Sequence, residues 1–283
     1  MSVKRSIHTD AIHSAIIAEL EKINFILAGE VVKAFSSMKD REESALAKKT
    51  LELLGENARI AGECRIPLCQ DCGSVVIFME IGQQLVIEGD ALSTAVDAAV
   101  GEAYRKFYLR KSIVRDPLRR ENTGTNAPAF LHTDIVPGDA LRMMILLKGG
   151  GSENMTALKM LRPTASLDDI VEYIAGHVRE AGPNPCPPLF LGIGLGGTAD
   201  VAMVNSKKAV FRGLGTSHPD PFYAKLEQRI MDAANETGVG PLGFGGVSTV
   251  AAVFIREAPT HIASLPVALN LNCHSLRCSE AVL

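Results

Sequence analysis

The sequence predicts an α+β fold, a helical N-terminal part followed by mixed sheets in an irregular α/β order. Two observations support this: apolar residues recur at helical spacing near the N-terminus, and later segments mix β-branched runs with helical stretches without regular βαβ alternation. The chain has 283 residues, 47% of them hydrophobic, enough to bury a sizeable core. Neither a repeat nor a compositional break divides it, so we expect a single domain over residues 1–283.

The first hundred residues are predicted to contain three helical regions and a strand. Residues 8–38 carry apolar side chains at helical spacing and predict one or two helices. Residues 41–64 are rich in Ala, Leu, Glu and Lys and predict another. The β-branched and aromatic segment 74–81 predicts a strand. Residues 90–109 predict a helix with Asp90 as its N-cap.

The middle of the chain predicts two paired strands and two helices. The strands cover residues 127–136 and 140–147 and are joined by the turn Pro137-Gly-Asp139. Residues 153–162 and 167–181 are predicted to be helical.

The last hundred residues continue the same mixture. Residues 189–193 predict a buried strand, and residues 198–211 and 221–236 predict helices. Residues 247–255 and 262–271 predict the strands that close the chain.

Composition excludes several classes of protein. The net charge of −3 gives no electrostatic basis for binding nucleic acid or an anionic membrane. Apolar runs are shorter than the ~18 residues of a membrane span, and the start has no signal-peptide pattern. Six cysteines are too few for a disulfide scaffold, so we expect a reducing cytoplasm.

Three cysteines lie where a hydrophobic segment meets a polar turn. Cys69 lies in Leu-Cys-Gln-Asp-Cys-Gly, Cys186 in Asn-Pro-Cys-Pro-Pro, and Cys273 in Asn-Leu-Asn-Cys-His-Ser. Such positions can present a thiolate to a metal, and three of them suggest three converging ligands. An iron–sulfur cluster normally takes four thiolates, so three would leave one iron open, as in a catalytic metal site.

The remaining cysteines allow another interpretation. Cys69-x-x-Cys72 is also a possible redox or zinc pair, and a zinc-binding interaction module would depend on it. Cys64 and Cys278 are interpreted as structural.

Two glycine-rich segments point to close backbone approaches. Gly149-Gly-Gly-Ser-Glu before a predicted helix is typical of an anion-binding loop, but it lacks the Lys of a nucleotide P-loop. Residues 192–197 fit G-x-G-x-x-G, which would favour a dinucleotide-binding oxidoreductase. The acidic residue expected about 20 positions later is missing. We therefore interpret these glycines as helix–strand packing.

Together these motifs resemble the class I, iron–sulfur-dependent fumarate hydratases and their L-tartrate dehydratase relatives. Cys-Gln-Asp-x-Gly, Gly-Gly-Gly-Ser-Glu-Asn, Cys-Pro-Pro and Asn-Cys-His carry the resemblance, which spans roughly residues 10 to 278. It covers the first half of the single-chain enzymes, so the chain resembles an alpha subunit. The family commonly has Thr where this chain has Cys72, so Cys72 departs from the pattern.

The resemblance implies a [4Fe-4S] cluster on Cys69, Cys186 and Cys273. It also implies substrate contacts by the residues Gln70, Asp71, Arg110, Gly150 and His261, with His261 and Asp71 catalytic. Arg110 is favoured within a basic cluster by its Leu-Arg-x-Ser setting, and His274 is the alternative to His261.

The implied reaction is reversible hydration of fumarate to (S)-malate. Tartrate dehydratase and mesaconase subunits are the alternatives in the same family. The family's catalytic base lies in a second domain. We therefore expect a separate beta subunit, a homodimer of the isolated chain and an α₂β₂ complex acting on a small dicarboxylate.

Overall fold

The computed structural model describes residues 5–283, which form two compact units. The first unit comprises the segment that ends at Leu27 together with Ile60–Gly150 and Arg277–Leu283. The second comprises Ala28–Arg59 and Gly151–Leu276. Each unit is assembled from separated stretches of sequence, so no single linker divides the chain. The mixture of helices with two four-stranded mixed sheets confirms the predicted α+β class.

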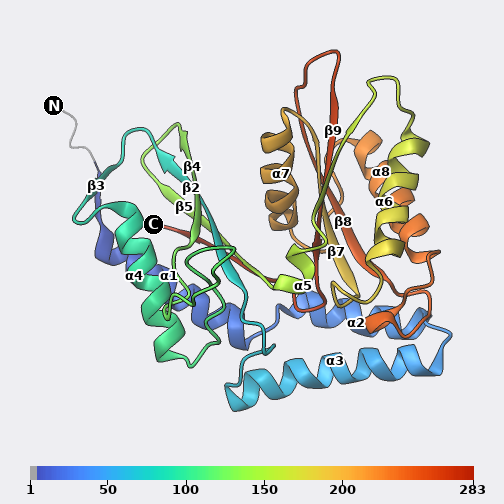
Figure 1. Ribbon diagram of the computed structural model, residues 1–283, viewed down its shortest axis with the longest axis horizontal. Helices are drawn as coiled ribbons and strands as arrows, with labels where there is room; N and C mark the ends of the chain where they lie inside the picture. The colour runs from blue at the N-terminus through green and yellow to red at the C-terminus, as the bar shows by residue number, and fades with distance from the viewer. Residues whose placement is uncertain (1–4) are drawn as a thin grey trace. The chain divides into compact units, whose positions relative to one another are not determined.

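A four-stranded sheet of order β10-β5-β2-β4 forms the centre of the first unit (Figure 1). Its strands are β2 (Ser74–Gly82), β4 (Phe130–Val136), β5 (Leu141–Lys148) and β10 (Arg277–Val282). β2 pairs parallel with β4 and antiparallel with β5. A small parallel sheet joins β1 (Ser6–His8) and β3 (Val86–Glu88).

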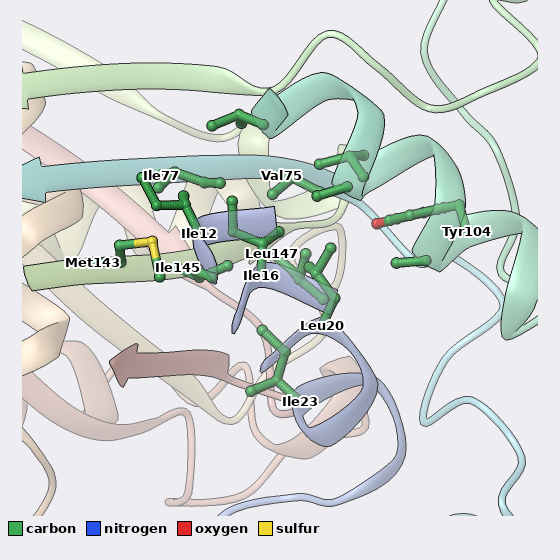
Figure 2. Packing of buried hydrophobic residues seen from close by; sticks show 14 of the residues in the cluster. Ile12, Ile16, Leu20, Ile23, Val75, Ile77, Tyr104, Met143, Ile145 and Leu147 are labelled. Atoms are coloured by element: carbon green, nitrogen blue, oxygen red, sulfur yellow. The ribbon is translucent and has the colours of Figure 1, made fainter. Parts of the chain in front are cut away.

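Helices α1 (Thr9–Phe25) and α4 (Leu92–Lys106) supply the apolar core of this unit. Figure 2 shows the α1 side chains and Tyr104 of α4 packed beside side chains of β2 and β5. The labelled residues are Ile12, Ile16, Leu20, Ile23, Val75, Ile77, Tyr104, Met143, Ile145 and Leu147. On α1 the buried positions follow the helical period that predicted this helix.

The second unit is built on a sheet of order β6-β9-β7-β8. Its strands are β6 (Ala157–Leu161), β7 (Leu189–Gly196), β8 (Val250–Ala258) and β9 (Leu265–Asn272). Helices α6 (Leu167–Ala181) and α8 (Pro221–Asn235) pack on one face, and α7 (Ala199–Lys208) packs on the other (Figure 1). The short elements are α5 (Gly150–Glu153) and the 3₁₀ helices Ala209–Arg212 and Pro241–Gly243.

Helices α2 (Gly29–Arg41) and α3 (Ala45–Cys64) confirm the helical predictions for the rest of the N-terminal part. Among residues 5–283, no helix has the length and apolar character required to cross a membrane.

The glycines of the G-x-G-x-x-G segment lie mostly within β7. A Cβ on Gly194 would lie 1.9 Å from the carbonyl oxygen of Ala202 on α7, and one on Gly192 would lie 2.0 Å from that of Ser206. The helix therefore packs directly on the backbone of the strand, and these contacts confirm the packing interpretation.

Three predictions about local structure are wrong. The segment 153–162, predicted to be helical, contains strand β6, which pairs with β9. β4 and β5 do not pair with each other, because β2 lies between them. The N-cap of α4 is Ala91 and not Asp90. The Asp90 N–H donates to the Thr9 hydroxyl.

Candidate functional site

The loop between α3 and β2 presents Cys69 with two polar partners. The Asp71 N–H donates to the Cys69 Sγ at 3.4 Å, and the Cys69 thiol donates to the Gln70 Oε1 at 3.1 Å. The Cys69 side chain is half-buried and Gln70 is exposed. The Cys69 sulfur therefore faces a backbone N–H donor on a partly exposed loop.

The Asp71 carboxylate joins this loop to the glycine-rich loop after β5. Its Oδ2 accepts the Gly150 N–H at 2.7 Å, and its Oδ1 accepts the Gly73 N–H at 3.0 Å. The resemblance assigns Gly150 to the substrate. In the structure, its N–H already donates to the carboxylate of Asp71. The expected helix dipole is minor here, because α5 is a single turn of four residues.

Three buried side chains hold the next three carbonyl groups of the Cys69 loop. The Arg277 Nη2 donates to the Asp71 carbonyl at 2.8 Å. The Tyr104 hydroxyl lies 2.9 Å from the Cys72 carbonyl and 3.0 Å from that of Gly73. The Asn126 Nδ2 donates to the Gly73 carbonyl at 3.1 Å. Strand β10, helix α4 and the loop before β4 thus fix the backbone at Asp71 to Gly73.

Cys72 belongs to the packing beneath the loop. Its side chain is 2% exposed, and its Sγ accepts the Arg110 N–H at 3.2 Å. Burial raises the pKa of the Cys72 thiol, although the hydrogen bond from Arg110 opposes the rise. In residues 5–283 no three His, Cys, Asp or Glu side chains are grouped to hold a single metal ion. The burial of the Cys72 side chain disfavours a zinc site on Cys69-x-x-Cys72.

In the second unit, the segments that carry Cys186 and Cys273 are hydrogen-bonded to each other. The His274 N–H donates to the Cys186 carbonyl at 3.0 Å. Cys186 is exposed and has a φ of +55°, a left-handed conformation that is uncommon outside glycine. The half-buried Cys273 Sγ lies 3.3 Å from the Ser275 hydroxyl.

The glycine-rich loop also contacts the Cys186 segment within the second unit. A Cβ on Gly151 would lie 2.7 Å from the Asn184 carbonyl oxygen, so this position requires glycine. Glu153 follows, and both of its carboxylate oxygens accept from the Lys207 Nζ, at 2.6 and 2.5 Å. This pair ties the loop to the end of α7.

The polar residues expected to contact substrate lie in different settings. Arg110 is exposed, and its backbone is fixed by the bond to Cys72. His261 is exposed in the connection between β8 and β9, where its Nδ1 accepts the Ala263 N–H at 3.1 Å. Strand β9 separates His261 from Cys273, and its eight residues extend for about 25 Å. One chain therefore does not bring His261 to Cys273.

No sequence motif marks the buried residues that hold the backbone of the Cys69 loop. Tyr104 lies within a helix, Asn126 follows a glycine turn, and Arg277 lies in a strand that was not predicted. None of them belongs to a motif, and only the strand pairing brings Arg277 beneath Asp71.

Comparison with known proteins gives one consistent group. The sequence model described as fumarate hydratase (Fumerase) matches residues 13–282. A Methanocaldococcus jannaschii protein, provisionally named L(+)-tartrate dehydratase subunit alpha, is 38% identical over 267 residues, 92% of this chain and 93% of the relative. The L(+)-tartrate dehydratase subunit alpha of Escherichia coli strain UTI89 is 32% identical over 252 residues, 88% of this chain and 82% of the relative.

Proposed function

Because the chain belongs to the fumarate hydratase (Fumerase) family of hydro-lyases, we propose that it is the alpha subunit of an L-tartrate dehydratase. The observation that carries this proposal is the identity of 38% and 32% to two proteins named as alpha subunits for that substrate, over most of both chains. Fumarate, the main expectation from the motifs, becomes the second candidate substrate, supported by the name of the matching family. Mesaconate is the third.

The cysteines available in the chain are chemically suited to an iron–sulfur cluster. Cys69, Cys186 and Cys273 are thiols on loops and none is fully buried, whereas Cys72 is enclosed by the protein. We propose the first three as ligands. The Asp71 N–H supports the Cys69 sulfur, and the bond from His274 to Cys186 holds the other two segments together. With three thiolate ligands, a bound cluster supplies an open iron that acts as a Lewis acid.

The residues around Cys69 would hold and orient a small diacid. Gln70 and Arg110 are exposed, and a guanidinium can bind a carboxylate through two parallel hydrogen bonds. Asp71 occupies the Gly150 N–H, so a substrate carboxylate must share or replace that contact. We propose that Asp71 and Gly150 act as one unit that positions the substrate.

His261 is proposed to reach the substrate of a second copy of the chain. The length of β9 keeps it away from Cys273 of its own chain, and symmetric dimers are the commonest oligomers. His274, adjacent to Cys273, is the alternative within one chain.

A beta subunit completes the proposal. The relatives are named as alpha subunits, and no motif of this chain supplies a base for the carbon-bound proton. We propose that residues 1–283 act as one alpha-type domain in a cytoplasmic α₂β₂ complex. The beta subunit would add the base and exclude water from the site.

The test is anaerobic co-expression of this chain with the beta-type chain of the same genome. Dehydration of L-tartrate, (S)-malate and methylmalate, the hydration product of mesaconate, is compared by kcat/KM. Each chain alone is the control. We expect L-tartrate to be preferred and each chain to be inactive alone. A preference for malate would support the fumarate alternative, and full activity without the beta chain would contradict the subunit assignment.

A further inference from the structure

The first unit contains a buried arginine, Arg277, whose guanidinium has few hydrogen bonds. Arg277 is the first residue of β10, opposite Leu147 of β5, and is 3% exposed. The single hydrogen bond of its side chain within residues 5–283 goes from Nη2 to the neutral carbonyl of Asp71, at 2.8 Å. The Nε and Nη1 atoms are buried and have no hydrogen-bond partner among these residues.

Such an arrangement is unfavourable for folding alone. Removing a guanidinium from water is costly unless its N–H groups are paired, and an apolar side chain of similar size is often as stable at such a position. A buried donor without a partner therefore calls for an explanation outside packing.

The position of Arg277 supplies that explanation. The Asp71 carbonyl that it holds belongs to the residue whose N–H donates to Cys69 Sγ and whose carboxylate holds Gly150. The charge also acts on the groups of this region. Burial raises the pKa of Tyr104, and the positive charge of Arg277 opposes the rise. The buried guanidinium of Arg277 thus lies next to the Cys69 loop, where a positive charge attracts a bound anion.

We propose that Arg277 is a positioning residue for the reaction, which fixes the Cys69–Asp71 loop through the Asp71 carbonyl and supplies a buried positive charge to the anionic group that the loop holds. The inference rests on the proposed function, in which this group is a thiolate-bound iron–sulfur cluster. A buried cation stabilises the more negative, reduced form of such a cluster and raises its reduction potential, because net charge and hydrogen bonding set that potential.

The test compares Arg277→Met, Arg277→Lys and the control Arg142→Met in the complex with the beta chain. Arg142 lies on β5 of the same sheet and is paired with Glu80 and Glu280, so its loss removes an arginine without touching the loop. Iron and sulfide content, thermal unfolding and the reduction potential of the cluster are measured for each protein.

We expect a more negative potential in Arg277→Met, partial recovery in Arg277→Lys, and no change in Arg142→Met. An unchanged potential in a fully loaded Arg277→Met protein, or equal shifts for Met and Lys, would overturn the electrostatic role.

Amide hydrogen exchange of the chain without iron provides the second readout. Arg277→Met should accelerate exchange at Asp71 and Gly150 and leave the strands of the second unit unchanged. Unaltered exchange at these two amides would overturn the positioning role. The comparison needs no bound cluster, so it also applies to a variant that takes up none. Absence of iron from the anaerobically prepared wild-type complex would instead contradict the proposed function, and the exchange comparison would still decide whether Arg277 holds the loop.

Discussion

The Gly150 N–H donates to the Asp71 Oδ2 at 2.7 Å, which joins the two loops that contain Cys69 and the glycine run. A carboxylate that accepts two backbone N–H groups is held in one orientation. We predict that Asp71→Asn lowers kcat/KM by a factor that corresponds to a loss of roughly 2–4 kcal/mol of transition-state binding. The reason is that the amide has one oxygen for two donors and no charge. The matched control is Asp97→Asn, since the Asp97 carboxylate also accepts a backbone N–H, from Ala129. Equal losses in the two variants would indicate a general effect on folding.

Cysteine substitutions should separate the proposed ligands from their neighbours. Cys69→Ser, Cys186→Ser and Cys273→Ser should each remove the cluster chromophore and activity together, since a serine hydroxyl is a poor ligand for iron. Cys72→Ser should keep the iron, because the Cys72 side chain is buried and bonded to the Arg110 N–H. Iron and sulfide analysis measures this. Loss of iron in Cys72→Ser with retention in Cys186→Ser would refute the assignment.

Arg110→Met should act on the substrate and leave folding unchanged. The side chain is exposed, so its loss breaks no internal packing. We expect KM to rise or kcat/KM to fall. If bound substrate buries the charge pair between its carboxylate and Arg110, the change corresponds to a loss of roughly 2–4 kcal/mol of transition-state binding. Arg115→Met, in the same basic cluster, is the control and should retain near wild-type values. Steady-state kinetics and the cluster absorption spectrum are the measurements.

Mixed dimers test whether His261 acts on the site of its own chain or on the site of a second copy. Purified His261→Ala and Cys273→Ser complexes are inactive separately in our proposal. If His261 acts on the site of a second copy, random mixing yields some dimers with one intact site and recovers about a quarter of wild-type activity. If His261 acts within its own chain, neither site of a mixed dimer is intact and no activity returns. Exchange of subunits is verified with differently tagged chains.

Glu42 should make the second unit sensitive to acid. Burial alone would raise the pKa of Glu42, but hydrogen bonds from the Ser248 side chain and from the N–H groups of Ser44, Val247 and Glu43 outweigh it and lower the pKa. A lowered pKa in the folded state contributes stability that is present above the ordinary value of 4.5 and lost as pH falls through the folded value. Glu42→Gln should therefore cost about 2 kcal/mol at pH 7, and the difference should shrink below pH 4.5. Urea unfolding at pH 7, 5 and 3.5 measures this. A constant difference would contradict the ionic contribution.

The local elements with strong patterns were determined by the sequence itself. The helical spacing of Ile12, Ile16 and Leu20 places one face of α1 in the core, and the β-branched run after Gly73 forms the central strand β2. Physical constraints of this kind act within a few residues, so they are visible without the fold. The cysteine and glycine motifs gave the family in the same way, since they are contiguous stretches of sequence.

Only the tertiary structure decided the partners of these elements. Ala157–Leu161 contains good helix formers, yet pairing with β9 makes it a strand, because tertiary hydrogen bonds outweigh weak intrinsic propensities. Arg277 acquires its place beneath Asp71 through pairing with β5, and Tyr104 and Asn126 reach the same loop from distant segments. A contact between residues separated by tens or hundreds of positions depends on how the whole chain packs. The contiguous motifs therefore predict the residues proposed to face the chemistry, and the fold reveals the residues that hold the Cys69 loop in place.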